Sequence, residues 1–304
     1  MKNPIKFLSF LIWLMPVALL AQSIDGKTVL QDIQYLSGDQ LGGRKTLSEG
    51  NLVAREYIKE RFKSQGLHSQ FSDFTQFFNF KNEREGKFYE NAANIVGFMP
   101  GSETDKLIVV MAHYDHIGQT DEVIFNGADD NASGVAALLS LSEYFSKNRP
   151  MHSMMFVALD AEEMGLQGAK ALVNDFPFPI EQVVLNINMD MISRNDKNEL
   201  YAVGTYHYPK LKPILEKVSQ GKSPKLMLGH DQPNTGFEDW TMSSDHALFH
   251  KNNIPFIYFG VEDHQDYHQP TDTFENIHPE FYLGAVQLIL DALIAFDKEL
   301  IPLK

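Results

Sequence analysis

Short apolar runs alternate with segments of helical period over most of this chain, and this alternation restricts the fold more than any other feature. Residues 107–112 and 154–159 are apolar throughout, as expected for strands that are buried on both faces. Residues 133–145 and 166–173 carry helical patterns, and a further strand is predicted over residues 183–191. Strands that alternate with helices predict an α/β fold with a mostly parallel central sheet sandwiched by helices.

The same pattern continues on both sides of this region. Two more strands and two more helices are predicted, over residues 94–99 and 254–259 and over residues 211–218 and 281–296. Residues 195–244 are richer in Gly, Pro and polar residues, and their pattern gives no clear order of elements. Because no linker divides the sequence, we expect one domain over residues 22–304.

The sequence before residue 94 predicts one helix and one extended segment. Thr46-Leu47-Ser48-Glu49 has the form of a capping box, and Gly66 is the expected stop. The apolar residues between them recur at helical spacing, which predicts an amphipathic helix with a packing role. Residues 71–80 are rich in phenylalanine and are predicted to be extended. Their rings are more typical of core or edge-strand residues than of a ligand stack.

The N-terminus has the parts of a secretory signal peptide. A basic start precedes the apolar residues 7–20, and the small residue Ala21 precedes the expected cleavage site before Gln22. A membrane-spanning helix is the weaker interpretation, because it needs about 20 apolar residues and Pro16 interrupts this stretch. We therefore expect residues 1–21 to be removed and the mature chain to be periplasmic or secreted, without stable membrane insertion.

The composition is acidic and contains no cysteine. Forty Asp and Glu residues stand against 26 Lys and Arg residues, which gives a net charge of −14. A surface of this sign repels phosphate backbones, and no basic run creates a local exception, so nucleic acid is not an expected partner. The lack of cysteine excludes disulfides, thiolate ligands and a lipid-modified cysteine, so any metal site must use histidine and carboxylate.

Two histidines and an acid follow the predicted strand 107–112 at the point where it ends. They are His113, Asp115 and His116 in the string AHYDH. A histidine at the carboxyl end of a strand can reach the ligand crevice of an open sheet. Asp115 can accept the second ring N–H of His113 and so fix its tautomer. Taken alone, such a motif is more often a satisfied buried polar pair than a metal site.

A glycine-bracketed turn carries two adjacent carboxylates. Asp129 and Asp130 lie in the string NGADDNASG, just before the predicted helix 133–145. An acidic turn at a helix N-terminus also has an ordinary role as a cap, but a cap needs one short polar side chain. A carboxylate pair after a strand that ends in histidine instead suggests a bridging ligand for two cations.

Further polar positions accompany the later strands. Glu162 and Glu163 follow residues 154–159, where two glutamates are usually surface charges but can also divide into one ligand and one base. Asp190 stands inside an apolar run, where an unpaired carboxylate costs several kcal/mol and so needs a cation or strong donors. His268 lies in a late turn. This set offers only imidazole nitrogen and carboxylate oxygen, which Zn²⁺ accepts, and it predicts metal-assisted hydrolysis.

The polar strings together resemble a known family. AHYDH, NGADDNASG, LDAEEMGLQG, NMDMIS and DYHQPTDTFENI are similar, in this order, to successive motifs of the bacterial di-zinc aminopeptidases, which belong to the clan MH metallopeptidases. Glutaminyl cyclases and transferrin-receptor-like proteins are relatives of that family. The resemblance covers residues 94–296, and the L-x-G-R segment at residues 41–44 is also similar. No single motif is decisive, but all of them in order are a highly specific signal.

The resemblance implies two zinc ions per chain, with no other cofactor. It places one ion on His113 and Asp190 and the other on Glu163 and His268, with Asp130 as the bridge. Two Zn²⁺ ions about 3.5–4 Å apart lower the pKa of a shared water towards neutral. The Asp130 carboxylate would keep the ions close and offset their mutual repulsion.

Catalytic and supporting roles are implied in the same way. Glu162 becomes the general base, which takes a proton from water and passes it to the leaving amine. Tyr267 becomes a donor to the oxyanion. A cis peptide between Asp130 and Asn131 is expected, and residues 244–246 are expected to support the site rather than to ligate metal.

Four large aromatic residues are candidates for a pocket that receives the substrate's N-terminal side chain. They are Phe237, Trp240, Phe249 and Tyr258, although large aromatics at such positions more often belong to the core. A preference for leucine-like or other apolar N-terminal residues is implied only by the family resemblance.

Three other functions fit parts of this pattern. A glutaminyl cyclase uses one zinc for intramolecular acyl transfer, whereas His113 together with Asp190 favours two metals and hydrolysis. A non-catalytic binding module needs neither ligands nor base, whereas every such position is filled here. A di-metal phosphatase or deacetylase is disfavoured, because no glycine-rich loop with lysine is present. The expected protein is therefore an exported zinc aminopeptidase whose partners are peptide substrates with a free N-terminus.

Overall fold

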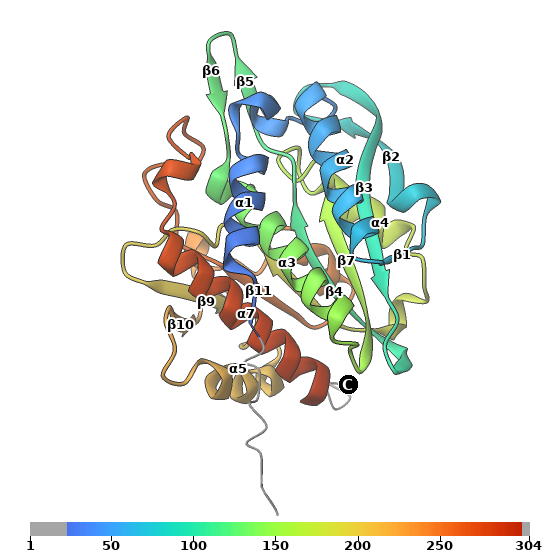
Figure 1. Cartoon of the computed structure of the whole chain (residues 1–304), viewed down its shortest axis with the longest axis vertical. Helices are drawn as coiled ribbons and strands as arrows, with labels where there is room; N and C mark the ends of the chain where they lie inside the picture. The colour runs from blue at the N-terminus through green and yellow to red at the C-terminus, as the bar shows by residue number, and fades with distance from the viewer. Residues whose placement is uncertain (1–22, 300–304) are drawn as a thin grey trace, which may run out of the picture.

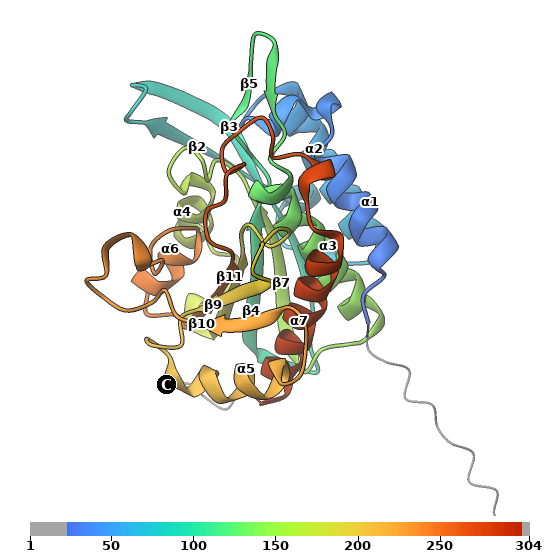
Figure 2. The same cartoon turned by 90° about the vertical axis from the view of Figure 1, so that its left-hand side faces the viewer.

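A central sheet runs through the molecule, with helices packed on both of its faces (Figures 1 and 2). The structure is a computed structural model that describes residues 23–299 of the 304-residue chain. The predicted signal peptide and its cleavage site before Gln22 lie outside the described residues. The α/β sandwich expected from the sequence is confirmed.

Nine strands form the main sheet, and a separate hairpin is made of β5 (Gly118–Thr120) and β6 (Val123–Phe125). The strands of the main sheet are β1 (His68–Ser69), β2 (Thr75–Asn82), β3 (Lys87–Met99), β4 (Glu103–His113), β7 (His152–Leu159), β8 (Val183–Met189), β9 (Glu199–Val203), β10 (Lys225–Leu228) and β11 (Phe256–Gly260). Their order across the sheet is β1-β3-β7-β4-β8-β11-β9-β10, and β2 pairs with β3.

The centre of the sheet is parallel and its flanks are mixed. β7, β4, β8 and β11 run parallel to one another, whereas β3 joins β7 and β9 joins β11 in antiparallel pairs. The continuous apolar runs in the sequence correspond to the parallel strands, because those strands are covered on both faces. On the flank beyond β3, the strand β2 lacks that signature and mixes buried with exposed residues.

Helices divide between the two faces of the sheet. They are α1 (Gly26–Leu36), α2 (Glu49–Ser64), α3 (Gly134–Lys147), α4 (Gln167–Asn174), α5 (Lys212–Ser219), α6 (His246–Lys251) and α7 (Pro279–Glu299). Figure 2 shows α1, α2, α3 and α7 on one side of the sheet, and α4 with α6 on the other. By length and composition α7 could cross a membrane, but its apolar residues Leu288, Ile289 and Leu293 are buried in the larger core.

The first predicted helix is present as α2, but its cap differs from the predicted one. Ser48 rather than Thr46 is the N-cap, and its Oγ accepts a hydrogen bond from the Asn51 N–H at 3.2 Å. The Thr46 hydroxyl donates instead to Asp160, 3.0 Å away in the buried region behind the site. Gly66 lies just past the helix end with φ of +74°, as expected for a stop.

The phenylalanine-rich segment behaves as predicted for core and edge residues. The extended part begins at Thr75, after a 3₁₀ turn at Ser72–Phe74, and β2 pairs only with β3. Phe74 and Phe80 are buried, whereas Phe77 is exposed and lies under the Arg55 guanidinium.

The segment without a clear order, residues 195–244, contains two short strands and one helix. β9 and β10 extend the sheet beyond β11, with α5 between them in the chain. The sequence also gave no prediction of α1, α6 or the β5–β6 hairpin. α6 has six residues and each hairpin strand has three, so hydrophobic period cannot identify them.

The topology brings predicted site residues together at the carboxyl ends of the central parallel strands. β4 ends at His113, Glu162 and Glu163 lie in the turn after β7, and Asp190 follows the end of β8. Because these strands are parallel and adjacent, their carboxyl ends open at the same crevice.

Candidate active site

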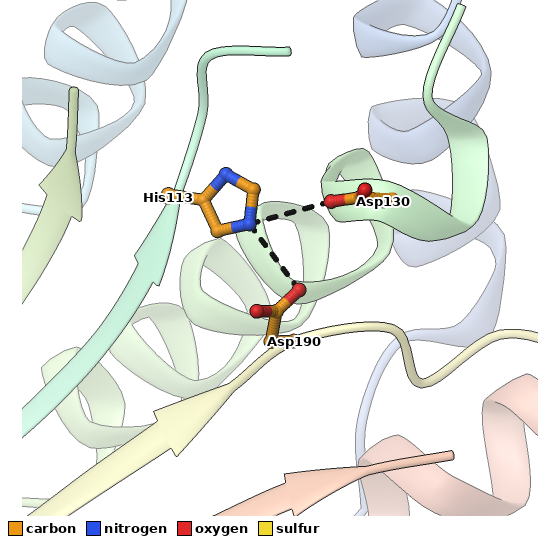
Figure 3. A group of neighbouring side chains, drawn as sticks. All are labelled: His113, Asp130 and Asp190. Atoms are coloured by element: carbon orange, nitrogen blue, oxygen red, sulfur yellow. Dashed lines mark hydrogen bonds and ion pairs between the residues drawn. The ribbon is translucent and has the colours of Figure 1, made fainter. Parts of the chain in front are cut away.

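Three of the predicted ligands meet directly where β4, β8 and the turn before α3 converge (Figure 3). The His113 Nε2 atom lies 3.2 Å from Asp190 Oδ1 and 3.4 Å from Asp130 Oδ1. His113 and Asp130 are almost completely buried. These side chains form one histidine and carboxylate group of the kind that binds a metal ion.

A second group forms on the other side of Asp130. The His268 Nε2 atom lies 3.0 Å from Asp130 Oδ2 and 3.6 Å from Glu163 Oε2. His116 also faces this group, with its Nδ1 atom 2.9 Å from Glu163 Oε1 and 3.7 Å from Asp130 Oδ2. Asp130 therefore presents one carboxylate oxygen to each group, which is the position expected of a bridging ligand.

The two groups share one cavity of about 330 Å³. All seven residues that the sequence predicted for the site line it, namely His113, Asp130, Glu162, Glu163, Asp190, Tyr267 and His268. Four of them are carboxylates, and the like charges cannot be held together in a buried cavity without cations or shared protons. Burial raises the pKa of Glu162 well above its usual range, and the neighbouring Asp245 and Asp190 raise it further.

The donor set fits a pair of zinc ions. Glu163 Oε1 and His268 Nε2 are buried atoms without a hydrogen-bond partner among the described residues. Burial opposes ionisation of Asp130, yet the facing histidines, His116 foremost, hold the pKa of its carboxyl well below its usual range. Ionised carboxylate and unpaired imidazole nitrogen around one cavity are suitable ligands for Zn²⁺.

The turn at Glu162 and Glu163 is fixed by Asp115. The Asp115 carboxylate accepts a hydrogen bond from the Glu162 N–H at 3.0 Å and from the Glu163 N–H at 3.3 Å. This differs from the prediction that Asp115 accepts the ring N–H of His113. The His113 Nδ1 atom lies 3.2 Å from the backbone carbonyl oxygen of Asp115 and 3.8 Å from its carboxylate. The carboxylate is turned away because the two amide N–H groups occupy it.

Asp272 holds the turn that carries the bridging ligand. Its carboxylate accepts the N–H of Asp129 at 2.8 Å and the N–H of Asp130 at 3.0 Å. The two neighbouring acids then part: Asp129 accepts both the backbone N–H and the hydroxyl of Ser193, whereas Asp130 points into the cavity. The peptide bond between Asp130 and Asn131 is cis, as the family resemblance implies.

Arg44 links the loop after His113 to the turn that carries Asp130. It is fully buried, and its guanidinium donates to the backbone carbonyls of Tyr114 at 2.9 Å and Gly127 at 2.9 Å. It also donates to the carbonyls of Leu36 at 2.5 Å and Asn126 at 2.7 Å. Four carbonyls on one planar cation fix the His113 loop relative to the Asp130 turn.

The Ser244-Asp245-His246 segment supports the site, as predicted. The Ser244 hydroxyl donates to Asp190 Oδ2 at 2.8 Å and accepts from the Asn188 side chain at 2.9 Å. This leaves Asp190 Oδ1 facing His113. The His246 ring is buried and stacks on Tyr258 with ring centroids 4.7 Å apart.

Tyr267 stacks on His268 with ring centroids 3.9 Å apart, and both line the cavity. Burial, with Asp130 and Asp190 nearby, raises the pKa of the Tyr267 phenol above its usual value, so the hydroxyl keeps its proton and can donate it in a hydrogen bond. Among the aromatic candidates for a side-chain pocket, Phe237, Trp240 and Tyr258 line the cavity. Phe249 does not, because it is fully buried in the smaller core under α6.

The roles of Arg44, Asp272 and His116 were not predicted from the sequence. Arg44 and His116 lie in the strings L-x-G-R and AHYDH, and Asp272 lies in DYHQPTDTFENI, so each was inside a recognised motif. The available signal for Arg44 was its place in the L-x-G-R segment, which also resembles the family.

The sequence matches Peptidase family M28 over residues 94–293, and the chain belongs to this family. This confirms the resemblance that the five polar strings indicate. The matched region contains all seven residues that the sequence predicted for the site.

Curated relatives carry peptidase names. A probable zinc metalloprotease of Phaeosphaeria nodorum is 30% identical over 184 residues, covering 52% of this chain and 37% of the relative. Aminopeptidase YwaD of Bacillus subtilis is 26% identical over 234 residues, covering 70% of this chain and 47% of the relative. The chain thus spans less than half the length of either relative.

Solved structures share the fold over nearly the whole chain. A leucine aminopeptidase precursor from Bacteroides thetaiotaomicron has a TM-score of 0.72 at 17% identity, covering 90% of this chain and 97% of that one. Glutaminyl cyclase from Porphyromonas gingivalis has a TM-score of 0.74 at 17% identity, covering 89% and 98%. The shared fold therefore accommodates both reactions, and the site residues must decide between them.

Proposed function

We propose that this chain is a zinc metallopeptidase that removes N-terminal residues from peptides with two zinc ions bound. The observation that carries the proposal is the position of Asp130, whose two carboxylate oxygens face separate histidine and carboxylate groups. Family membership and the peptidase names of the relatives support the reaction class. A single-zinc enzyme would not need both groups around one carboxylate.

Each protein group has a defined task in this proposal. His113 and Asp190 would hold one ion, Glu163 and His268 the other, and Asp130 both. Zinc in such a site lowers the pKa of bound water towards neutral and polarises the substrate carbonyl. Ser244 keeps Asp190 in place, and Asp115 keeps the glutamate turn in place, so the ligands are oriented before metal arrives.

Glu162 is the proposed general base. Its side chain lines the cavity beside Glu163, and its backbone is fixed by Asp115. From there it can take a proton from the attacking water and return it to the leaving amine. The Tyr267 hydroxyl lines the same cavity and would donate a hydrogen bond to the oxygen that becomes negative during attack.

The function is tested with a panel of fluorogenic aminoacyl amides, together with their N-acetylated counterparts. We expect hydrolysis of the free-amine substrates, loss of activity with a chelator, and recovery with zinc. Elemental analysis of zinc-saturated protein should give about two zinc ions per chain. Equal cleavage of N-acetylated substrates would leave a hydrolase that is no aminopeptidase. One zinc per chain, with release of ammonia from peptides that begin with glutamine, would instead identify a glutaminyl cyclase.

Export is the other part of the proposal, and it rests on the N-terminal sequence alone. We expect the chain isolated from its native cell to begin at Gln22, because the apolar stretch 7–20 and Ala21 precede that position. N-terminal sequencing or intact mass of the cell-derived protein measures this. A chain that still carries residues 1–21 would contradict export by signal-peptide cleavage.

A further inference from the structure

His116 lies at the metal site but belongs to neither of the predicted ligand pairs. It follows Asp115 just past the end of β4, and only 1% of its surface is exposed. Its ring packs against Gly127, where a Cβ atom would lie 2.6 Å from two ring atoms, and where φ is +58°. The turn that carries Asp130 is therefore shaped to accommodate this imidazole.

The ring nitrogens of His116 lack the hydrogen-bond partners that a buried imidazole normally has. Both ring nitrogens are buried and have no hydrogen-bond partner among the described residues. A buried polar group without a partner is rare in folded proteins, and several such groups that converge indicate a binding place for an ion or another ligand.

Three unpaired atoms converge beside Asp130. His116 Nδ1 is 2.9 Å from Glu163 Oε1, yet neither atom meets the directions of a hydrogen bond, and both remain unpaired. His268 Nε2 is also unpaired, although it lies 3.0 Å from Asp130 Oδ2 and 3.6 Å from Glu163 Oε2. Polar atoms that lie this close without hydrogen-bonding one another have the arrangement expected of ligands around one bound ion.

We propose that His116 is a fourth protein ligand, through Nδ1, of the zinc ion held by Asp130, Glu163 and His268. The inference rests on the proposed zinc site. Ligands about 2.0–2.2 Å from a tetrahedral Zn²⁺ ion lie roughly 3.3–3.6 Å from one another. The His116 and His268 nitrogens lie 2.9–3.7 Å from carboxylate oxygens of Asp130 and Glu163, which is close to that range.

The two metal positions then differ in kind. The position at Asp130, Glu163, His268 and His116 has four protein ligands, as in closed structural zinc sites. The position at Asp130, His113 and Asp190 has three, as in catalytic sites that leave one place for water or substrate. The inference therefore assigns water binding and substrate contact to the His113 side and tighter zinc retention to the His116 side.

Two substitutions separate ligation from mere orientation of Glu163. His116→Ala removes the imidazole, whereas His116→Asn places an amide near the position of Nδ1, where it can still hydrogen-bond to Glu163 but is a poor zinc ligand. The matched control is His152→Gln. His152 is equally buried but lies at the start of β7, at the opposite edge of the sheet, where its Nδ1 is 2.9 Å from the Asp297 carbonyl oxygen.

Zinc dissociation constants are measured by competition with a chelating indicator, with circular dichroism to confirm folding. We expect two unequal sites in the unaltered chain and in His152→Gln. Both His116 variants should weaken the tighter site by more than the ~10–100-fold that follows loss of a residue outside the ligand shell. Cobalt-substituted protein adds a second readout, because exchange of an imidazole ligand for water or an amide changes the ligand field and should shift the visible absorption of Co²⁺ at that site in both variants.

Each other outcome has a definite meaning. Tight zinc binding and an unchanged cobalt spectrum in His116→Ala would overturn the inference while leaving the two-zinc proposal intact. Recovery of binding in His116→Asn would make His116 a positioning residue for Glu163 rather than a ligand. Failure of the unaltered chain to bind a second zinc would refute the proposed function itself.

Discussion

Glu162→Gln is expected to abolish most turnover while leaving the fold and both zinc ions in place. Glutamine keeps the size of the side chain but cannot take a proton, and loss of a general base costs ~10²–10⁴-fold or more in rate. The backbone hydrogen bond from Glu162 to Asp115 is unaffected, so the turn should stay fixed. The measurements are kcat on a free-amine aminoacyl substrate and zinc per chain by elemental analysis.

Glu163→Gln is the matched control, because it makes the same chemical change one residue further along the same turn. The Glu163 carboxylate faces His116 and His268, so its loss should lower zinc occupancy rather than proton transfer. Added zinc should therefore restore part of the activity of Glu163→Gln and none of that of Glu162→Gln. A fully active Glu162→Gln would show that the base has been assigned to the wrong residue.

Three of the predicted site residues could be expected to lie close together because they follow the ends of strands. His113, Glu162 and Asp190 follow the three adjacent parallel strands β4, β7 and β8, and the apolar runs of those strands are unmistakable. Once the strands are known to be parallel, their carboxyl ends must meet. The order of the polar residues along the chain thus translated directly into proximity.

The contacts that hold the site together could not be predicted in this way. Arg44 reaches Tyr114 and Gly127 over 70 and 83 positions of sequence, and Asp272 reaches Asp130 over 142. These pairs depend on how loops pack, and loop packing leaves no period in the sequence. For the same reason Asp115 was given a side chain as its partner, whereas the structure gives it two backbone amides.

The sequence pattern also could not decide between neighbouring residues of similar chemistry. Thr46 and Ser48 are both good helix caps, and only the competing acceptor at Asp160 takes Thr46 away from that role. His113 and His116 are likewise both histidines at one strand end. Their difference lies in which side of Asp130 each ring faces, and that is set by the backbone after β4.

Asp130→Ala is expected to weaken both zinc sites, because the Asp130 carboxylate faces both groups. Its Oδ1 faces His113 and its Oδ2 faces His268. His268→Ala, by comparison, should weaken mainly one site. Removing the shared carboxylate takes a ligand from each site and leaves the two cations without the negative charge between them, so each site should bind its ion more weakly.

Zinc content and zinc-dependent thermal stability measure this effect together. A ligand that binds only the folded chain stabilises it by about 2.7 kcal/mol at 100 times its Kd, so the unaltered protein should show a Tm that rises with zinc. Asp130→Ala should show a smaller rise at the same zinc concentration. Asp129→Asn is the matched control, because Asp129 is the neighbouring buried acid, but its carboxylate is engaged by Ser193 and His264 and not by either metal group.

The control should keep two zinc ions and the zinc-dependent rise in Tm, even if its baseline stability falls. Zinc affinity that falls at one site and stays unchanged at the other in Asp130→Ala would mean that Asp130 belongs to only one of the two groups. Since the whole two-metal arrangement depends on this carboxylate facing both ways, that result would also remove the main physical reason to expect a second zinc ion.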